Sequence, residues 1–236
     1  IQRAKNFEQK GKPQQAAVLW EKILEIRKQT LGAEHPDTAQ ALIALSRQYM
    51  TMQNYVAAER FLNQCLAINP QALGAEHRAE ALLNMADLYR QQDRLNESIK
   101  FNKLGLALAE ETLGSEHPDL ATPLNNLAAT YSELGLVGQA EALFKRSLAI
   151  TEKSTGSEGL ESATTLGNLG AMYKTQGRFD EAERLLRQSL EIREHLQGAM
   201  HPDTCGLLIN LAELYRSLQN YGKVIVFYKR FFNTCP

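Results

Sequence analysis

A phrase of nine residues recurs through this chain of 236 residues, and the repetition limits the fold more than any other feature. It reads LGAEHPDTA at 31–39, LGAEHRAEA at 73–81, LGSEHPDLA at 113–121, TGSEGLESA at 155–163 and QGAMHPDTC at 197–205. A tyrosine follows each copy, and the spacings between these tyrosines are 40, 42, 42 and 42 residues: Tyr49, Tyr89, Tyr131, Tyr173 and Tyr215. Repeats of this length are typical of solenoids, in which each repeat packs only on its neighbours.

Each repeat carries two helical patterns and no strand pattern. Within residues 118–134, apolar residues recur at the three- and four-residue spacing of one helix face, and residues 138–155 do the same. A short turn separates the two segments. We therefore expect an all-α chain built from antiparallel helix pairs.

The recurring phrase predicts the end of one helix and the start of the next. Its glycine is favoured just past a helix end, because glycine adopts a positive φ without steric cost. The proline of His-Pro-Asp suits the first helical position, and the aspartate complements the helix dipole. Two copies depart from the pattern, since Arg78 replaces the proline in one and Gly159-Leu160 replaces His-Pro in another.

The histidines of the phrase invite a metal-site hypothesis, which their spacing argues against. They recur once per repeat, and stacked repeats lie about 20 Å apart if each helix occupies 8–10 Å. Zinc ligands must all lie about 2 Å from one ion. We therefore expect loop residues and no metal at His35, His77, His117 and His201, and a surface position for His195.

Small residues recur where neighbouring helices would have to approach closely. One set lies three residues before each tyrosine: Ser46, Ala86, Ala128, Gly170 and Ala212. A second set lies nine residues after Phe7 or after a tyrosine of the repeat: Ala16, Ala58, Ser98, Ala140 and Ala182. This pattern resembles the tetratricopeptide repeat (TPR), and the 42-residue form with LG-x-EHPD and NNLA-x-x-Y is similar to the kinesin light chain repeats and their bacterial relatives.

The resemblance implies a right-handed superhelical solenoid of antiparallel helix pairs. It predicts a single TPR domain over residues 1–236 with about six helix pairs, the first of them truncated. We expect the chain to be a fragment of a longer protein. The resemblance also implies that the first helix of each pair lines a concave groove that binds protein segments.

An asparagine recurs on the predicted groove face, five residues before the tyrosine: Asn84, Asn126, Asn168 and Asn210. The first full repeat has Ala44 instead. An amide both donates and accepts hydrogen bonds, so such a row could bind the main chain of an extended peptide. The alternative is that the amides bond only to the adjacent repeat and set its rotation.

Charged residues flank this row at helical spacing: Arg47, Asp87, Arg90, Lys174 and Arg216. The basic members could form a stripe that favours acidic peptides, or they could belong to a solvated face. Asn125, beside the small Gly167 and Ala171, is a candidate for a pocket that holds an apolar or aromatic anchor.

Several classes of function are not supported. The formal net charge is −1, which argues against a nucleic-acid partner, and no apolar run is long enough for a membrane span. The motifs GxSxG, HExxH, GxGxxG and the P-loop are missing, so we expect no enzyme and no cofactor. Cys65, Cys205 and Cys235 form no CxxC pair, and we expect them to be small packing residues of a cytoplasmic protein in a reducing compartment.

The sequence thus favours a scaffold that binds an extended peptide of a partner protein. An alternative is a structural module that self-associates through its open ends, because aromatic residues crowd the end of the chain at Phe227, Tyr228, Phe231 and Phe232. A third reading is the regulatory domain of a larger enzyme.

Overall fold

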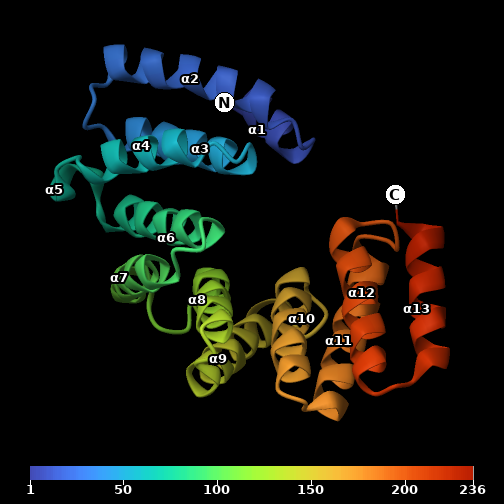
Figure 1. Ribbon diagram of the computed structural model, residues 1–236. Helices are drawn as coiled ribbons and strands as arrows, with labels where there is room; N and C mark the ends of the chain where they lie inside the picture. The colour runs from blue at the N-terminus through green and yellow to red at the C-terminus, as the bar shows by residue number, and fades with distance from the viewer. Residues whose placement is uncertain (236) are drawn as a thin grey trace. The chain divides into compact units, whose positions relative to one another are not determined.

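The computed structural model describes residues 1–235, which are helical throughout and contain no strand (Figure 1). The chain divides into two compact units, residues 1–116 and a unit that begins at His117. The first unit contains α1 (Gln2–Gln9), α2 (Pro13–Thr30), α3 (Pro36–Thr51), α4 (Tyr55–Leu66), the short α5 (Pro70–Leu73), α6 (Ala75–Gln91) and α7 (Leu95–Leu113). The second contains the 3-10 turn η1 (Pro118–Leu120), α8 (Ala121–Glu133), α9 (Val137–Thr155), α10 (Leu160–Thr175), α11 (Phe179–Leu196), α12 (Pro202–Ser217) and α13 (Tyr221–Thr234).

The helices of each unit pack as consecutive antiparallel pairs. The pairs α1/α2, α3/α4 and α6/α7 form the first unit, and α8/α9, α10/α11 and α12/α13 form the second. Within a unit, the second helix of one pair packs on the first helix of the next, as α9 does on α10 and α11 on α12. The prediction of an all-α fold of stacked helix pairs is confirmed.

The recurring phrase ends one helix and begins another, as predicted. Its glycines all have positive φ, from 76° at Gly74 to 96° at Gly32. Three histidines do more than occupy a loop, because each is the residue before a helix and caps its free backbone N–H groups. Nδ1 of His35, His117 and His201 accepts a hydrogen bond from the N–H of Asp37, Asp119 and Asp203, at 3.1, 3.3 and 3.2 Å.

The expectation that His77 is a loop residue was wrong. Helix α6 begins at Ala75, so His77 lies in its first turn. The cause is Arg78, because without a proline at this position nothing confines the helix start to the residue after the histidine. His195 lies in the last turn of α11 and is exposed, as expected.

The small residues of the sequence pattern lie where helices meet. Ala16, Ala58, Ala140 and Ala182 have no exposed surface. A Cβ atom added to Gly170 would lie 2.9 Å from Cγ of Leu186, closer than real side chains approach. Close helix approach at these positions therefore depends on small side chains.

A hydrogen bond joins successive helix pairs at the tyrosine of the repeat. In four of the five repeats, the tyrosine phenol donates to a glutamate on the second helix of the preceding pair. The bond measures 2.6 Å in Tyr49–Glu21 and 2.9 Å in both Tyr89–Glu59 and Tyr173–Glu141, and Tyr215 bonds to Glu183 in the same way. Tyr49, Tyr89 and Tyr215 also pack against a phenylalanine of the helix that follows, with ring centroids 5.3–5.5 Å apart.

The Glu141 carboxylate is contacted by three donors at such a junction. Lys145 lies 2.7 Å away, the Tyr173 phenol donates at 2.9 Å and Nη1 of Arg178 donates at 2.9 Å. These donors, Lys145 first, lower the pKa of Glu141 from 4.5 to about 2. Burial and the bond to Glu141 raise the pKa of Tyr173. The junction is thus built to keep one carboxylate ionised.

The cysteine prediction was wrong for two of the three residues. Cys205 in α12 and Cys235 after α13 form a disulfide, with Cα atoms 6.0 Å apart and a sequence separation of 30. The pair could not be recognised from its spacing in the sequence, because it is the antiparallel packing of α12 and α13 that brings the start of α12 close to the end of α13. Cys65 is a buried free thiol, as expected of a packing residue, and burial raises its pKa to about 12. The expectation of a reducing compartment therefore loses its support.

Among the described residues, none of the helices has the length and hydropathy needed to cross a membrane.

Replacing Glu141 with Gln should change how the stability of the second unit depends on pH. A carboxyl whose folded pKa is lowered stabilises the fold above its unfolded pKa, and this contribution disappears as pH falls through the folded value. We expect the free energy of unfolding of wild type to exceed that of Glu141→Gln at neutral pH, and the difference to vanish between pH 4.5 and about 2. Urea denaturation across this range measures it, with Glu152→Gln on the exposed side of α9 as control. A constant difference down to pH 2 would contradict the assignment.

Reducing the disulfide should destabilise the last helix pair. Closing a loop of 30 residues is worth about 2–4 kcal/mol. We expect Cys235→Ser to lower the melting temperature to that of the reduced wild type, and Cys65→Ala to retain the redox dependence. Alkylation of thiols in intact cells followed by mass spectrometry reports the compartment, because disulfides persist in oxidising surroundings. Three free thiols in protein isolated without reductant would contradict the pairing.

Candidate functional site

Three cavities follow one another along α10 in the second unit. The first, of about 250 Å³, lies among α8, α10 and the end of α11. The second, of about 390 Å³, lies between α10 and α12, and the third, of about 430 Å³, lies between α8 and α10. The first two share Thr164, Arg193 and Asp203 as walls, and the last two share Asn168 and Ala171. Because they share these residues, the three cavities are neighbours along α10, and we call this row the α10 groove.

The predicted asparagines are half-buried, and three of them line this groove. Asn126 lines the first cavity, Asn168 the second and third, and Asn210 the second. The amide of Asn168 donates to Oδ1 of Asn125 at 3.2 Å, and Oδ1 of Asn210 accepts from Lys174 at 3.0 Å. In the first unit, the amide of Asn84 donates to the carbonyl of Glu80 in its own helix at 2.8 Å.

The predicted charged residues are mostly paired with opposite charges. Lys174 contacts Glu213 at 2.6 Å, Arg90 contacts Asp87 at 3.1 Å, and Arg47 contacts Glu80 at 3.0 Å. Arg216 is exposed on α12. Because each of the three pairs is neutral, the cations contribute less positive potential than the sequence pattern indicates.

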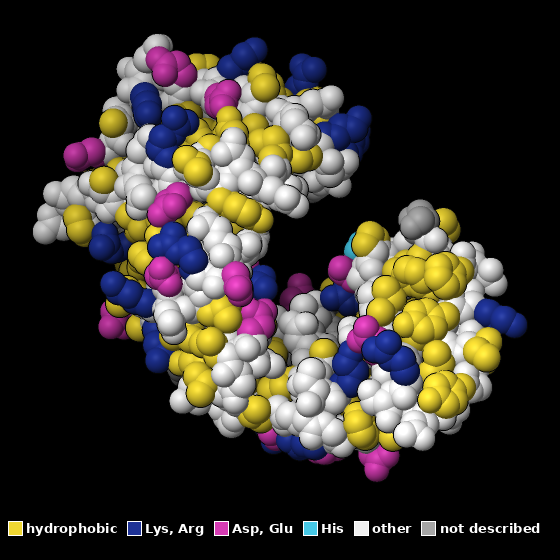
Figure 2. Space-filling view, in the orientation of Figure 1, with side chains coloured by type: hydrophobic (Ala, Val, Ile, Leu, Met, Phe, Trp, Pro, Cys, Tyr) yellow, Lys and Arg dark blue, Asp and Glu magenta, His cyan; other side chains and the backbone are white. Residues whose placement is uncertain are grey.

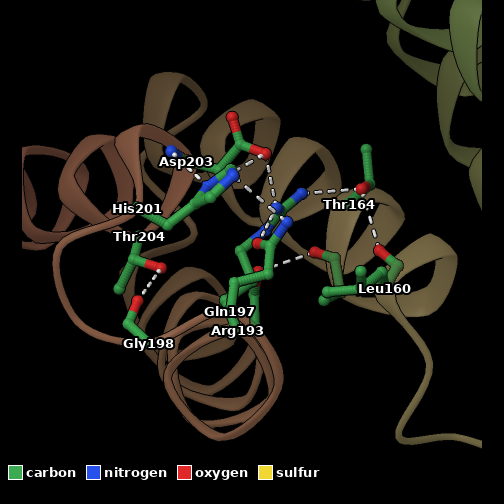
Figure 3. Close-up of polar contacts among 10 residues, drawn as sticks. Leu160, Thr164, Arg193, Gln197, Gly198, His201, Asp203 and Thr204 are labelled. Atoms are coloured by element: carbon green, nitrogen blue, oxygen red, sulfur yellow. Dashed lines mark hydrogen bonds and ion pairs between the residues drawn. The ribbon is translucent and has the colours of Figure 1, made fainter. Parts of the chain in front are cut away.

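A buried arginine forms the wall between the first and second cavities (Figure 3). Arg193 is 7% exposed and reaches from α11 across to two other helices. It donates to Oγ1 of Thr164 on α10 at 2.7 Å, to Oδ2 of Asp203 on α12 at 2.6 Å and to Oε1 of Gln197 at 2.9 Å. Asp203 is exposed, whereas the Arg193 guanidinium is buried, so its three bonds hold it in place between α10 and α12.

The pocket expected beside Asn125, Gly167 and Ala171 has a different character from the one predicted. Gly167 is a packing position, because an added Cβ atom would lie 3.2 Å from Ser189 and 3.3 Å from Leu207. Ala171 lines the second and third cavities, while Asn125 lines the first, whose walls are rich in polar side chains. The three residues therefore line more than one cavity of the row, and the pocket for an apolar or aromatic anchor stays a prediction.

Several groove residues were missed by the sequence analysis. Thr122, Thr164 and Gly206 lie one helical turn before Asn126, Asn168 and Asn210, so the repeat spacing contained the signal. Gly206 opens the second cavity, because an added Cβ atom would meet nothing within 4 Å. Arg193 could also have been found, since the equivalent positions carry Ala109 and Thr151 and the arginine interrupts the pattern.

The last helix exposes apolar side chains, which gather over α13 in Figure 2. They include Phe232, 75% exposed, with Val226, Ile225 and Tyr221. Phe231 packs edge-on against Phe232, with ring centroids 5.4 Å apart. Phe231 also stands where the preceding repeats carry a small residue: Cys65, Gly105, Ser147 and Ser189.

A family model described as tetratricopeptide repeat matches residues 1–71, 77–153 and 156–233. The chain belongs to the tetratricopeptide repeat family. The 42-residue phrase resembles kinesin light chain repeats, and a putative kinesin light chain is among the structures with a similar fold. No curated protein matches the sequence.

Solved structures with the same fold include several TPR proteins. A putative kinesin light chain from Podosopora anserina with nearly identical TPR-like repeats is 29% identical, with a TM-score of 0.66 over 83% of this chain and 93% of that one. BtubC (BKLC) from P. vanneervenii is 20% identical, with a TM-score of 0.78 over 94% and 90% of the two chains. A Rap protein complexed with competence and sporulation factor is 16% identical, with a TM-score of 0.70 over 98% and 72%. TPR repeats of this kind suggest a scaffold for protein–protein interaction.

Proposed function

We propose that the chain is a non-enzymatic scaffold that binds an extended peptide segment of a partner protein in the α10 groove. The row of three neighbouring cavities along α10 carries the proposal. An extended peptide advances about 3.3 Å per residue and presents alternate side chains to a surface, so a row of small cavities suits it better than a single compact ligand.

The groove offers the hydrogen-bonding groups that such a segment needs. The half-buried amides of Asn126, Asn168 and Asn210 can exchange donors and acceptors with a peptide main chain. Lys174 and Glu213 lie beside Asn210, so this end of the groove offers both signs of charge. The Rap protein was solved with competence and sporulation factor bound, which supports ligand binding by a similar stack of helices.

Gly206 offers a sharp test, because it is exposed on α12 and its missing side chain leaves the second cavity open. Replacing it with Gln, the residue at the equivalent position 40, should fill the cavity without harming the helix, since Gln is the better helix former. We expect random-peptide display on wild type to enrich a motif, and Gly206→Gln to bind the enriched peptide about tenfold more weakly or worse. Fluorescence anisotropy of the labelled peptide measures the change.

Gly138→Gln on α9 is the matched control, because its added side chain also meets nothing within 4 Å and lies outside the groove. The double variant Asn126→Ala, Asn168→Ala tests the amides directly, with circular dichroism to confirm the fold. Equal loss in Gly206→Gln and Gly138→Gln, or full binding by the double variant, would place the peptide elsewhere.

Self-association through α13 is the second candidate function, with a second copy of the chain as the partner. Phe231 is bulky and occupies the position at which the other repeats have a small residue, so it obstructs the close helix approach made by a stacked repeat. The exposed apolar face of α13 therefore suits a partner surface that differs in shape from a stacked repeat. If this is correct, the mass measured by multi-angle light scattering should rise with concentration, and Phe232→Ser with Val226→Ser should keep the chain monomeric. A constant monomer mass in wild type would rule this function out.

A further inference from the structure

The first cavity of the groove concentrates buried polar side chains. Asn125, Ser147, Thr165 and Arg193 line it and are each at least nine-tenths buried, with exposures of 6%, 0%, 1% and 7%. The equivalents of Asn125 in the other repeats are Ile43, Leu83, Gly167 and Ile209, and those of Thr165 are Ala41, Ala81, Pro123 and Leu207. Packing alone therefore does not require polar groups here.

Most of the polar atoms in this cavity have partners inside the protein. Ser147 donates to the carbonyl of Ala121 at 2.8 Å and lies 3.2 Å from Oγ1 of Thr165, which in turn donates to the carbonyl of Glu161 at 3.1 Å. Arg193 is held by Thr164, Gln197 and Asp203, as Figure 3 shows.

Asn125 is the exception. Its Oδ1 accepts from Asn168, but no described residue accepts a hydrogen bond from its Nδ2. This Nδ2 atom is accessible to solvent, so it opens into the cavity that Asn125 lines. Because Nδ2 is open to solvent, it is free to bond to water in the unbound protein, and an acceptor on a ligand would take the place of that water.

Besides an acceptor for Asn125, the charges of the cavity favour a ligand that also carries a hydrogen-bond donor. Glu161 and Asp203 contribute two carboxylates and Arg193 one guanidinium. Asp203 is engaged by Arg193, whereas the Glu161 side chain is exposed at the rim. A carboxylate placed here would face the excess negative charge, whereas an N–H group would meet an acceptor.

We propose that this cavity binds the primary amide side chain of a glutamine or asparagine in the peptide that occupies the α10 groove. The amide carbonyl accepts from Nδ2 of Asn125, and the amide NH₂ donates to the Glu161 carboxylate. A glutamate would satisfy Asn125 but be repelled by the carboxylates, a lysine would leave Asn125 unpaired, and a leucine would satisfy neither. The inference rests on the proposed function, and it specifies the residue that the groove selects.

Capped single residues test the inference without a known peptide. Four probes are titrated into ¹⁵N-labelled full chain: the N-acetyl N-methylamides of glutamine, glutamate, lysine and leucine. We expect the glutamine probe to bind with a millimolar dissociation constant and to shift the Asn125 side-chain amide and the backbone signals of Thr164 and Thr165. The other three should bind at least about fivefold more weakly. No shift of these signals with glutamine, or stronger binding of glutamate, lysine or leucine, would overturn the assignment.

Two variants separate the cavity from the fold. Asn125→Leu, which takes the residue of equivalent position 83, and Glu161→Ala, on the exposed rim, should each weaken the glutamine probe about fivefold to tenfold. Asn102→Leu is the matched control, because Asn102 is another buried asparagine, 3% exposed on α7, and its equivalent position carries Leu62. Should Asn125→Leu fail to fold, Glu161→Ala decides. Unchanged binding in Glu161→Ala would overturn the proposal.

The two proposals fail in different ways. Peptide enrichment by display without binding of capped glutamine would retain the groove and reject the amide preference. Binding of capped glutamine at Asn125 without any enriched peptide would retain the cavity and reject the extended-peptide function.

Discussion

The contact between successive helix pairs is the interaction on which the rest of the structure depends. A helix pair alone cannot bury its apolar face, so each pair needs a neighbour at close range. Small residues such as Ala58, Ala140 and Gly170 allow that approach, and the tyrosine phenol crosses the junction to a glutamate of the preceding pair. Where it forms, this hydrogen bond fixes the orientation of one helix pair on the preceding pair. A different orientation would separate the tyrosine from its glutamate and leave the hydroxyl without a partner.

Because these contacts use only part of each helix, the residues on the exposed face of the first helix of each pair are free to vary in type. The contacts between pairs occupy the tyrosine, the small residue and the apolar stripe, whereas positions such as Thr164, Asn168 and Gly206 face the groove. The second unit uses that freedom to place an amide donor on α8 and a glycine on α12, and α11 adds a buried arginine between the first two cavities. The contacts between pairs thus position the α10 groove, and we expect the groove residues to determine what binds.

The repeat phrase allowed the fold to be predicted because its glycine, proline and small residues act locally. Gly32 ends a helix and Pro36 begins one whatever the rest of the chain does, so periodicity alone located the helices. The same local rule explains the error at His77, where Arg78 removed the proline that confines the helix start. The asparagine row was found by spacing, since each member lies on α8, α10 or α12 of the groove or on α6.

Features that depend on distant residues could not be predicted in the same way. The Cys205–Cys235 disulfide requires knowing that the ends of α12 and α13 meet. The neutral pair of Lys174 with Glu213 joins α10 to α12, so counting basic residues overestimated the positive charge of the groove. The polar character of the cavity at Asn125 results from four residues on four helices, and no spacing in the sequence specifies that they meet.

Hydrogen exchange of the full chain, with and without a peptide recovered by display, tests most directly whether the α10 groove is the binding surface. The account predicts slower exchange of backbone amides in α8, α10 and α12, which form the groove, and unchanged exchange in α3 and α4. Protection confined to α13, or spread evenly over both units, would contradict it.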